Sequence, residues 1–281
     1  MRRIVIPTDF SENAMNAICY AVALFKYERC EFFILHAYAD EVYDANADSA
    51  RAVFEEVKEL TQKKVAQELA RLNNQIKQIS PNPRHDYNML AVFGTLIDET
   101  NDIVNKENID VVVMGTKGKT NDRMLTFGSN TLQVLKYVKC PVLAIPEECM
   151  FEKPKHILFP TDYFLPYKRR ELKLLSTLAK SFRSTITMMH VSMYKKLSIR
   201  QEDNRMFLKE SLSDMTLEFK TISSEGLTLA INEYIKNQSI DVLVLVNSRH
   251  SYLESVLYQS TIDKIGLHIK IPFLILQNLD R

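Results

Sequence analysis

Several features that mark common protein classes are missing from this sequence. Its four cysteines form no C-x-x-C pair and no metal-ligand spacing, and its histidines form no H-E-x-x-H. No apolar run approaches about 18 residues, and the charged start at Met1–Arg3 leads straight into a short strand, so neither a membrane span nor a signal peptide is predicted. A net charge of +1 gives no general attraction to nucleic acid or acidic membranes. We therefore expect a cytoplasmic globular protein.

Two phosphate-binding fingerprints are also missing. Gly118-Lys119-Thr120 looks like the end of a Walker A loop, but the glycine that this loop requires five residues before Gly118 is Val113, in mid-strand. No G-x-G-x-x-G opens a helix. The two commonest phosphate loops are therefore excluded.

The most informative stretch that is present runs from Ile109 to Pro146. Its apolar, β-branched start fits a strand buried on both faces of a parallel sheet, which stops at Gly115. Gly118 follows, and Gly128 begins a helix. In open α/β sheets ligands lie outside the carboxyl ends of strands, and a helix N-terminus offers unpaired N–H groups to an anion. We predict an anion-binding loop, in which glycine permits close approach of the backbone or a positive φ.

Strands and helices alternate along the first half. A polar loop is expected over residues 39–47, and a long helix from about Asp48 to Gln78. The apolar stripe of this helix is expected to lie in the core, at Val53, Val57, Leu60, Val65, Leu69, Leu72 and Ile76. Strands are predicted at Arg3–Ile6, Phe32–Ala37, Tyr87–Phe93, Val111–Met114 and Pro141–Ile145. This order predicts a parallel sheet with helices on both faces.

The pattern then begins again after a charged linker near Glu147–Pro154. Residues 155–163 repeat residues 2–10 with Pro-Thr-Asp intact, and the later strands follow in the same order. A repeat of this size is a whole domain. We therefore predict an α/β protein with two tandem open five-stranded, mostly parallel sheets, in domains at residues 1–149 and 150–281.

The two halves differ at the glycine loop. Only its serine is retained in the second copy, as Ser260 opposite Ser129. The three glycines are replaced: Gly115, Gly118 and Gly128 stand opposite Val246, Arg249 and Gln259. Because these residues add side chains and do not take a positive φ cheaply, we expect only the first half to bind a ligand at this loop.

The spacing G-x2-G-x9-G-S, with the strand before it, resembles the nucleotide loop of the universal stress protein family, in its ATP-binding branch. The resemblance covers the whole first half, and the repeat resembles the tandem two-domain form. It implies a Rossmann-like fold of the adenine nucleotide alpha-hydrolase type. It also implies a stress-response regulator that binds ATP or another adenine nucleotide, with Mg²⁺ as a further candidate ligand. The implied nucleotide-binding residues are Pro7, Thr8, Asp9, Ala37, Met114, Gly115, Gly118, Gly128, Ser129, Asn130 and Thr131.

The same resemblance implies a role for each part of the site. Asp9 would reach the adenosine moiety, the backbone at Ala37 would hold the adenine edge, and Met114 and Gly115 would lie beside the ribose. The remaining loop residues would surround the phosphates. From the residues alone, Pro-Thr-Asp also fits a turn with a helix cap, which is the role we expect for Asp162 in the second half. His36 and His190 occupy matching strand positions, so we expect a structural role shared by both halves.

No catalytic group is evident. Hydrolysis of ATP needs a placed water, usually a base, and a metal held against the phosphates, and only Asp122 is acidic in the loop. We therefore expect a binding protein, with weak ATP hydrolysis or a nucleotide-independent interaction scaffold as alternatives. An ATP pyrophosphatase of the related adenine-α-hydrolase group ranks lower, because its S-G-G-x-D-S loop is replaced by Pro-Thr-Asp-Phe-Ser.

Each half ends in a short apolar strand, Pro141–Ile145 and Pro272–Leu276. The last strand of an open sheet leaves N–H and C=O groups unpaired along its edge, which invites association. Members of the family that resemble one half pair this strand in dimers, and here both copies lie on one chain. We predict that the two strands pair antiparallel as an intramolecular pseudo-dimer. A homodimer and an unidentified protein partner stay open.

Overall fold

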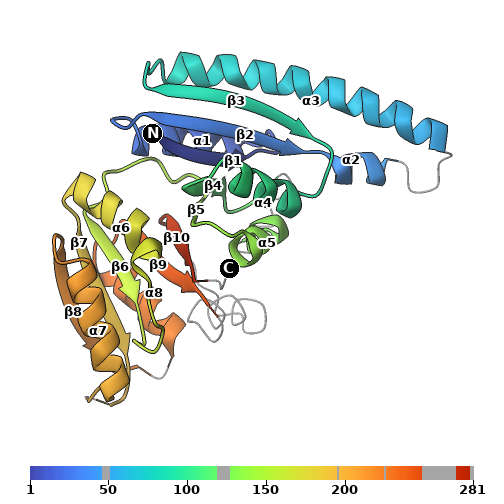
Figure 1. Ribbon diagram of the computed structural model, residues 1–281. Helices are drawn as coiled ribbons and strands as arrows, with labels where there is room; N and C mark the ends of the chain where they lie inside the picture. The colour runs from blue at the N-terminus through green and yellow to red at the C-terminus, as the bar shows by residue number, and fades with distance from the viewer. Residues whose placement is uncertain (46–50, 119–126, 195, 225, 249–269, 279–281) are drawn as a thin grey trace.

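The structure, a computed structural model shown in Figure 1, describes residues 1–45, 51–118, 127–194, 196–224, 226–248 and 270–278. The elements of the first half are β1 Arg2–Pro7, α1 Glu12–Leu24, β2 Cys30–Ala37, α2 Ala39–Asp44, α3 Arg51–Ile79, β3 His85–Val92, α4 Leu96–Lys106, β4 Val111–Gly115, α5 Ser129–Tyr137 and β5 Val142–Ile145. Those of the second half are β6 His156–Pro160, α6 Arg169–Phe182, β7 Thr185–Val191, α7 Ile199–Ser211, β8 Thr216–Ile222, α8 Leu227–Asn237, β9 Val242–Asn247 and β10 Phe273–Gln277.

The strands form one continuous sheet in the order β3-β2-β1-β4-β5-β10-β9-β6-β7-β8. Among the described residues, every neighbouring pair of strands is parallel except β5 and β10. The predicted α/β class, with two mostly parallel five-stranded sheets and helices on both faces, is confirmed. The structure adds that the two sheets are joined edge to edge into a single ten-stranded sheet.

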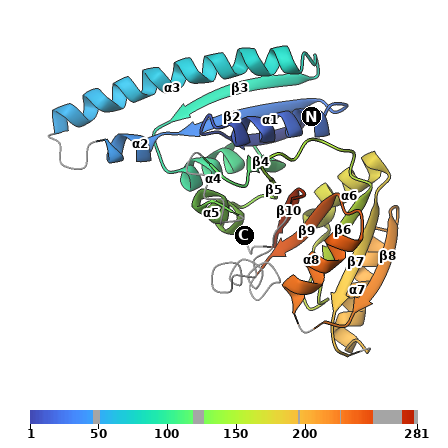
Figure 2. The same ribbon diagram turned by 180° about the vertical axis from the view of Figure 1, so that it is seen from behind.

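The join is made by the last strand of each half. β5 and β10 run antiparallel, with Phe273 opposite Ala144, Leu274 opposite Leu143 and Ile275 opposite Val142. The predicted pairing of these two strands is confirmed. It satisfies the backbone groups that an open edge would expose, and it buries the apolar side chains of both strands. Figures 1 and 2 show the halves side by side, with β10 next to the elements of the first half.

Local sequence explains the element boundaries next to the strand ends. Ser11 caps α1, because its hydroxyl accepts a hydrogen bond from the Ala14 N–H at 3.1 Å. Thr95 caps α4 in the same way, by accepting from the Asp98 N–H at 3.2 Å. Val111–Met114 is buried on both faces of the sheet, as its unbroken apolar pattern predicts.

Two predictions around α2 and α3 are wrong. Residues 39–44 form α2 rather than a polar loop, because Ala39 and Val42 are buried. The stripe of α3 is core only from Val65 onward, whereas Val53 and Leu60 are 44% and 57% exposed. A helix of 29 residues is roughly 44 Å long, but the eight-residue β3 beside it spans only about 26 Å, so the start of α3 extends beyond the sheet (Figure 2).

Candidate functional site

The centre of the first-half sheet brings the predicted site residues to one edge. β1 and β4 are adjacent and parallel, with Ile4 opposite Val111, so their carboxyl ends meet. β1 is followed by helix α1 on one side and β4 by the glycine loop, and the strand order reverses between them. This is the position at which open α/β sheets bind ligands.

Asp9 lies against the glycine loop. One carboxylate oxygen, Oδ1, accepts a hydrogen bond from the Ser11 N–H at 3.0 Å, which fixes the turn. The other, Oδ2, is so close to Gly118 that a β-carbon added there would lie 2.7 Å from it. The turn is also held by Thr8, whose hydroxyl accepts from the Phe10 N–H at 3.1 Å. Gly118 therefore permits the approach of a carboxylate to the loop backbone.

Asn13 is a site residue that the sequence analysis missed. Its side-chain Nδ2 donates to the Lys117 carbonyl at 2.7 Å and so ties α1 to the glycine loop. A β-carbon on Gly115 would lie 2.8 Å from this nitrogen, which explains the glycine. Asn13 is 7% exposed, and its Oδ1 has no hydrogen-bond partner among the described residues. Its contact with Lys117 spans 104 positions, which no local pattern reveals.

Gly128 is the N-cap of α5, and its N–H donates to the Thr116 carbonyl at 2.8 Å. Ser129 and Asn130 in the first turn are exposed, so their N–H groups and side chains are open to a ligand. Thr131 is different, because it is 2% exposed and its hydroxyl donates to the Gly115 carbonyl at 3.0 Å. Thr131 therefore positions the helix against β4.

The glycines of the loop do not serve a left-handed turn. No glycine among the described residues has a positive φ. Close approach of neighbouring groups accounts for Gly115 and Gly118, whereas Gly128 has ordinary space around it, with the nearest atom 3.6 Å from an added β-carbon. Of the two explanations offered by the sequence, close approach is the one that the structure supports.

The end of β2 completes the edge of the site. Ala37 is half-buried at the end of the strand, opposite Val92 of β3. Met114 is 6% exposed, and its side chain packs in the core, so only its backbone can face a ligand. His36 bridges the Thr8 carbonyl at 2.6 Å and the Glu41 carboxylate at 2.9 Å. This histidine braces the Pro-Thr-Asp turn from behind.

The second half repeats this brace, and a side chain of α7 contacts its turn. His190 contacts the Thr161 carbonyl at 3.1 Å, so a structural role shared by the two histidines is confirmed. Asp162 accepts from the Phe164 N–H at 2.8 Å, as expected for a turn. Gln201 of α7 donates to the Asp162 carbonyl at 2.8 Å and covers the turn. Burial raises the pKa of the Asp162 carboxyl. Arg249, Gln259 and Ser260 lie outside the described residues.

The second half also holds α5. The side chain of Asn247, at the end of β9, donates to the carbonyls of Leu135 and Lys136 at 3.2 and 2.9 Å. Gln277 of β10 donates to the Leu135 carbonyl at 3.1 Å. At the other end, the rings of Phe127 and Phe273 lie 5.5 Å apart. The last turn of α5 and the residue before its N-cap therefore both contact the second half.

Among the described residues, no group of three or more histidine, cysteine, aspartate or glutamate side chains is placed to hold a metal. No helix of the described chain has the length and apolar character that crossing a membrane requires. The site therefore consists of a carboxylate, an asparagine, close-packed glycine backbone and a helix N-terminus.

The fold is an open, doubly wound α/β sheet, and in proteins of this class ligands bind at the switch point. Residues 1–146 match the Universal stress protein family, which is just over half of the chain, and the chain therefore belongs to that family. Universal stress protein MJ0577 of Methanocaldococcus jannaschii is 27% identical over an alignment of 157 residues that covers 51% of this chain and 94% of that protein. Universal stress protein MJ0531 of the same organism is 27% identical over 154 residues, 55% of this chain and 84% of that protein.

The fold of the whole chain has solved counterparts. A universal stress protein from Archaeoglobus fulgidus superposes with a TM-score of 0.69 at 17% identity and covers 99% of this chain and 97% of its own. A functionally unknown protein, PA1789 from Pseudomonas aeruginosa, superposes with a TM-score of 0.58 at 10% identity over 99% and 92% of the two chains. These likenesses establish that both halves together adopt a fold already seen in this family.

Proposed function

We propose that the first half binds an adenine nucleotide at the carboxyl ends of β1 and β4. Residues 1–149 form the nucleotide-binding domain, and residues 150–281 form a second domain of the same family that has lost the site. The protein acts as a stress-response regulator whose state depends on the bound nucleotide. Family membership supports the choice of an adenine nucleotide and of this role.

The approach of Asp9 to Gly118 is the observation that carries the proposal. The carboxylate could accept from ribose or base N–H and O–H groups beside the backbone of Gly118. The exposed first turn of α5 supplies N–H groups for phosphate oxygens, assisted by the positive end of the helix dipole. The carboxylate at one end of the site suits a nucleoside, and the helix N-terminus at the other end suits the phosphates attached to it.

Each predicted residue then has a part in the proposal. Asp9 and the backbone at Ala37, Met114 and Gly115 take the nucleoside, and Gly118, Gly128, Ser129 and Asn130 take the phosphates. Pro7, Thr8 and Thr131 position these groups from within the protein. Asn13 joins them as a positioning residue, because it holds the Lys117 carbonyl in the loop.

Mg²⁺ would come with the phosphates. Among the described residues, the carboxylate of Asp9 lies against Gly118 of the loop, and Mg²⁺ commonly takes one or two carboxylates, phosphate oxygens and water. This arrangement binds and orients a nucleotide without a placed general base among the described residues, which favours binding over hydrolysis. A nucleotide-independent scaffold is the second candidate, since the tight packing of Gly115 against Asn13 also has a purely structural use.

Mass analysis of small molecules released from the purified chain tests the proposal. We expect an adenine nucleotide at up to one equivalent per chain. The matched variants are Gly128→Gln, which copies the second half, and Gly226→Gln at the N-cap of α8. An added β-carbon meets ordinary contacts at both sites, so both variants should fold. Gly128→Gln should lose the nucleotide and Gly226→Gln should keep it. Retention by a folded Gly128→Gln chain would contradict the assignment to this loop, and an unaltered chain that releases no nucleotide would favour the scaffold.

A further inference from the structure

A large cavity lies away from the glycine loop. Its volume is about 1360 Å³, and it opens between the two halves. Arg2 at the start of β1 and Asp110 before β4 line one side, and Arg170 and Lys173 of α6 line the other. The glycine loop is at the opposite end of β1 and β4, and a six-residue strand such as β1 spans roughly 20 Å. The cavity is therefore a separate site.

Cationic side chains dominate the lining of this cavity. Three lining residues are acidic, namely Glu28, Asp110 and Glu171. Six are basic, namely Arg2, Arg29, Lys139, Lys168, Arg170 and Lys173. The lining therefore carries a formal charge of +3 from these nine residues, against +1 for the entire chain. The cavity between the halves therefore carries a net positive charge.

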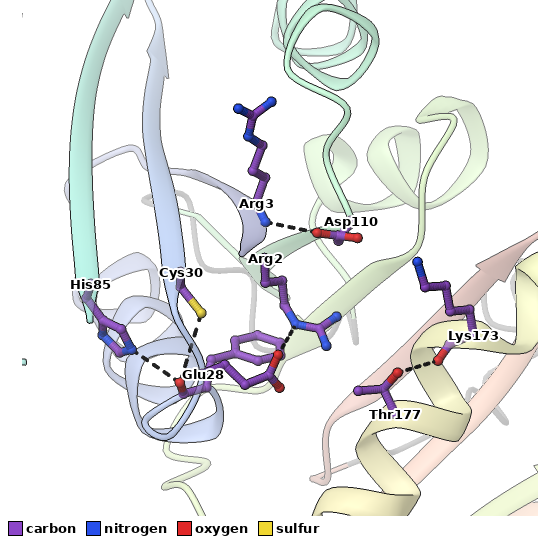
Figure 3. A network of polar contacts seen from close by, with 9 residues as sticks. Arg2, Arg3, Glu28, Cys30, His85, Asp110, Lys173 and Thr177 are labelled. Carbon is purple, nitrogen blue, oxygen red and sulfur yellow. Dashed lines mark hydrogen bonds and ion pairs between the residues drawn. The ribbon is translucent and has the colours of Figure 1, made fainter.

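The acidic residues are already engaged by other groups. Glu28 pairs with Arg2 at 2.8 Å, and the Arg2 side chain is only 11% exposed and lies over the Phe25 ring. Asp110 accepts from the backbone N–H of Arg3 at 2.9 Å, as Figure 3 shows. Glu171 accepts from the backbone N–H of Lys168 at 3.0 Å and so caps α6. These contacts fix the walls of the cavity and leave its charge unbalanced.

Four cations remain available to a ligand. Within the described residues, no ion pair joins the side chains of Arg29, Lys139, Arg170 or Lys173 to an acid. They come from both halves, two from each. Figure 3 shows Lys173 on α6 with its ammonium turned toward the first half. A single phosphate would fill little of a cavity of this size, whereas a chain of phosphates could reach cations on both walls.

We propose that this cavity binds a small polyphosphorylated anion, which bridges the two halves through Arg29 and Lys139 on one side and Arg170 and Lys173 on the other. The site is independent of the proposed nucleotide site. The cations of the two halves repel one another across the cavity. An anion bound between them relieves this repulsion, so the ligand should also hold the halves together.

Titration calorimetry of the full chain with sodium tripolyphosphate tests the proposal. We expect one equivalent bound and an affinity that falls as salt rises. The double variant Arg170→Glu/Lys173→Glu should weaken binding at least about tenfold, because two attractions become repulsions. The control Lys209→Glu/Lys236→Glu makes the same charge change at exposed positions on α7 and α8, and should stay within about twofold.

Three results would overturn the site: no binding by the unaltered chain, equal losses in the two double variants, or a loss caused by Gly118→Val instead. A loss caused by Gly118→Val would place the anion at the glycine loop. Failure of the cavity site can therefore be distinguished from failure of the proposed nucleotide site. If Arg170→Glu/Lys173→Glu does not fold, Arg170→Gln/Lys173→Gln serves, with a smaller loss expected. Titration of the Gly118→Val chain with ATP identifies the source: affinity at or above that of tripolyphosphate indicates a nucleoside polyphosphate, and weaker binding indicates free polyphosphate.

Discussion

In the first half, the turn at Asp9 faces the bare backbone of a glycine loop, whereas in the second half the turn at Asp162 is covered by side chains of α7. The brace behind each turn is the same, a histidine on the threonine carbonyl. The two turns differ in the residues that face them. Gly118 lies against the turn at Asp9, with Asn13 holding the loop, whereas Gln201 contacts the turn at Asp162. The turn and its histidine therefore belong to the fold shared by both halves, and we propose that the residues in front of the turn decide which half binds a ligand.

The largest effect is expected from Gly118→Val, which gives the first half a side chain as the second half has. The added β-carbon would lie 2.7 Å from Asp9 Oδ2 and displace that carboxylate. Overpacking of this kind costs about 1–3 kcal/mol, and occupation of the ligand's space adds to it, so nucleotide affinity should fall by about 100-fold or more. Calorimetry with ADP measures this. Gly226→Val, at a glycine with ordinary space, is the control and should bind normally.

The second prediction separates packing from ligand contact. Gly115→Ala should destabilise the chain by about 1–3 kcal/mol, because its β-carbon meets the Asn13 side chain. In the Asn13→Ala background the cost should be smaller, since most of the obstruction is gone. Urea unfolding of the four chains gives the coupling energy. Additive effects of the two substitutions would show that Asn13 is not what requires glycine at position 115.

A third, smaller effect concerns the hold of the second half on α5. Asn247→Ala removes two hydrogen bonds to the carbonyls of Leu135 and Lys136 and should lower the free energy of unfolding by about 1–2 kcal/mol. Hydrogen exchange should rise in α5. The exposed Asn237 at the end of α8 provides the control variant Asn237→Ala. Unaltered exchange in α5 would mean that the second half does not steady this helix.

The smallest effect is a pH dependence at the closed turn. Because burial raises the folded-state pKa of Asp162, the folded chain holds that proton to higher pH than the unfolded chain, and stability falls as pH rises from the ordinary pKa through the raised one. Asp162→Asn removes this loss while keeping an acceptor for the Phe164 N–H. Its stability gain should be present at pH 7 and vanish below the ordinary pKa of aspartate. A gain that is independent of pH would contradict this origin.

Sequence patterns predicted most of the fold because apolar runs and their repetition in the second half mark the strands and their order. The unbroken apolar run at Val111–Met114 marked a central strand, and the repeated apolar ends at β5 and β10 marked two edges that pair. The start of α3 was predicted wrongly because apolar periodicity does not report where the sheet ends; Val53 belongs to the stripe but lies beyond β3.

The candidate site could be predicted only where it follows a local motif. Asp9 and Gly118 belong to recognisable spacings, and the structure brings them together. Asn13 could not be found, because its importance arises from one contact with Lys117 across the sheet edge. The missing glycines predict that the second half does not bind a ligand. The contact of Gln201 with the Asp162 turn could not be found by comparing the two loops, because Gln201 lies on α7.

The central claim is that one half of this chain binds an adenine nucleotide and the other does not. Titration calorimetry with ADP measures the number of sites, and the Arg170→Glu/Lys173→Glu chain is the one to use because the proposed polyphosphate binding between the halves should be weakened in it. The account predicts one equivalent of ADP per chain, and none after Gly118→Val is added. Two equivalent sites, or one site that Gly118→Val leaves intact, would contradict it.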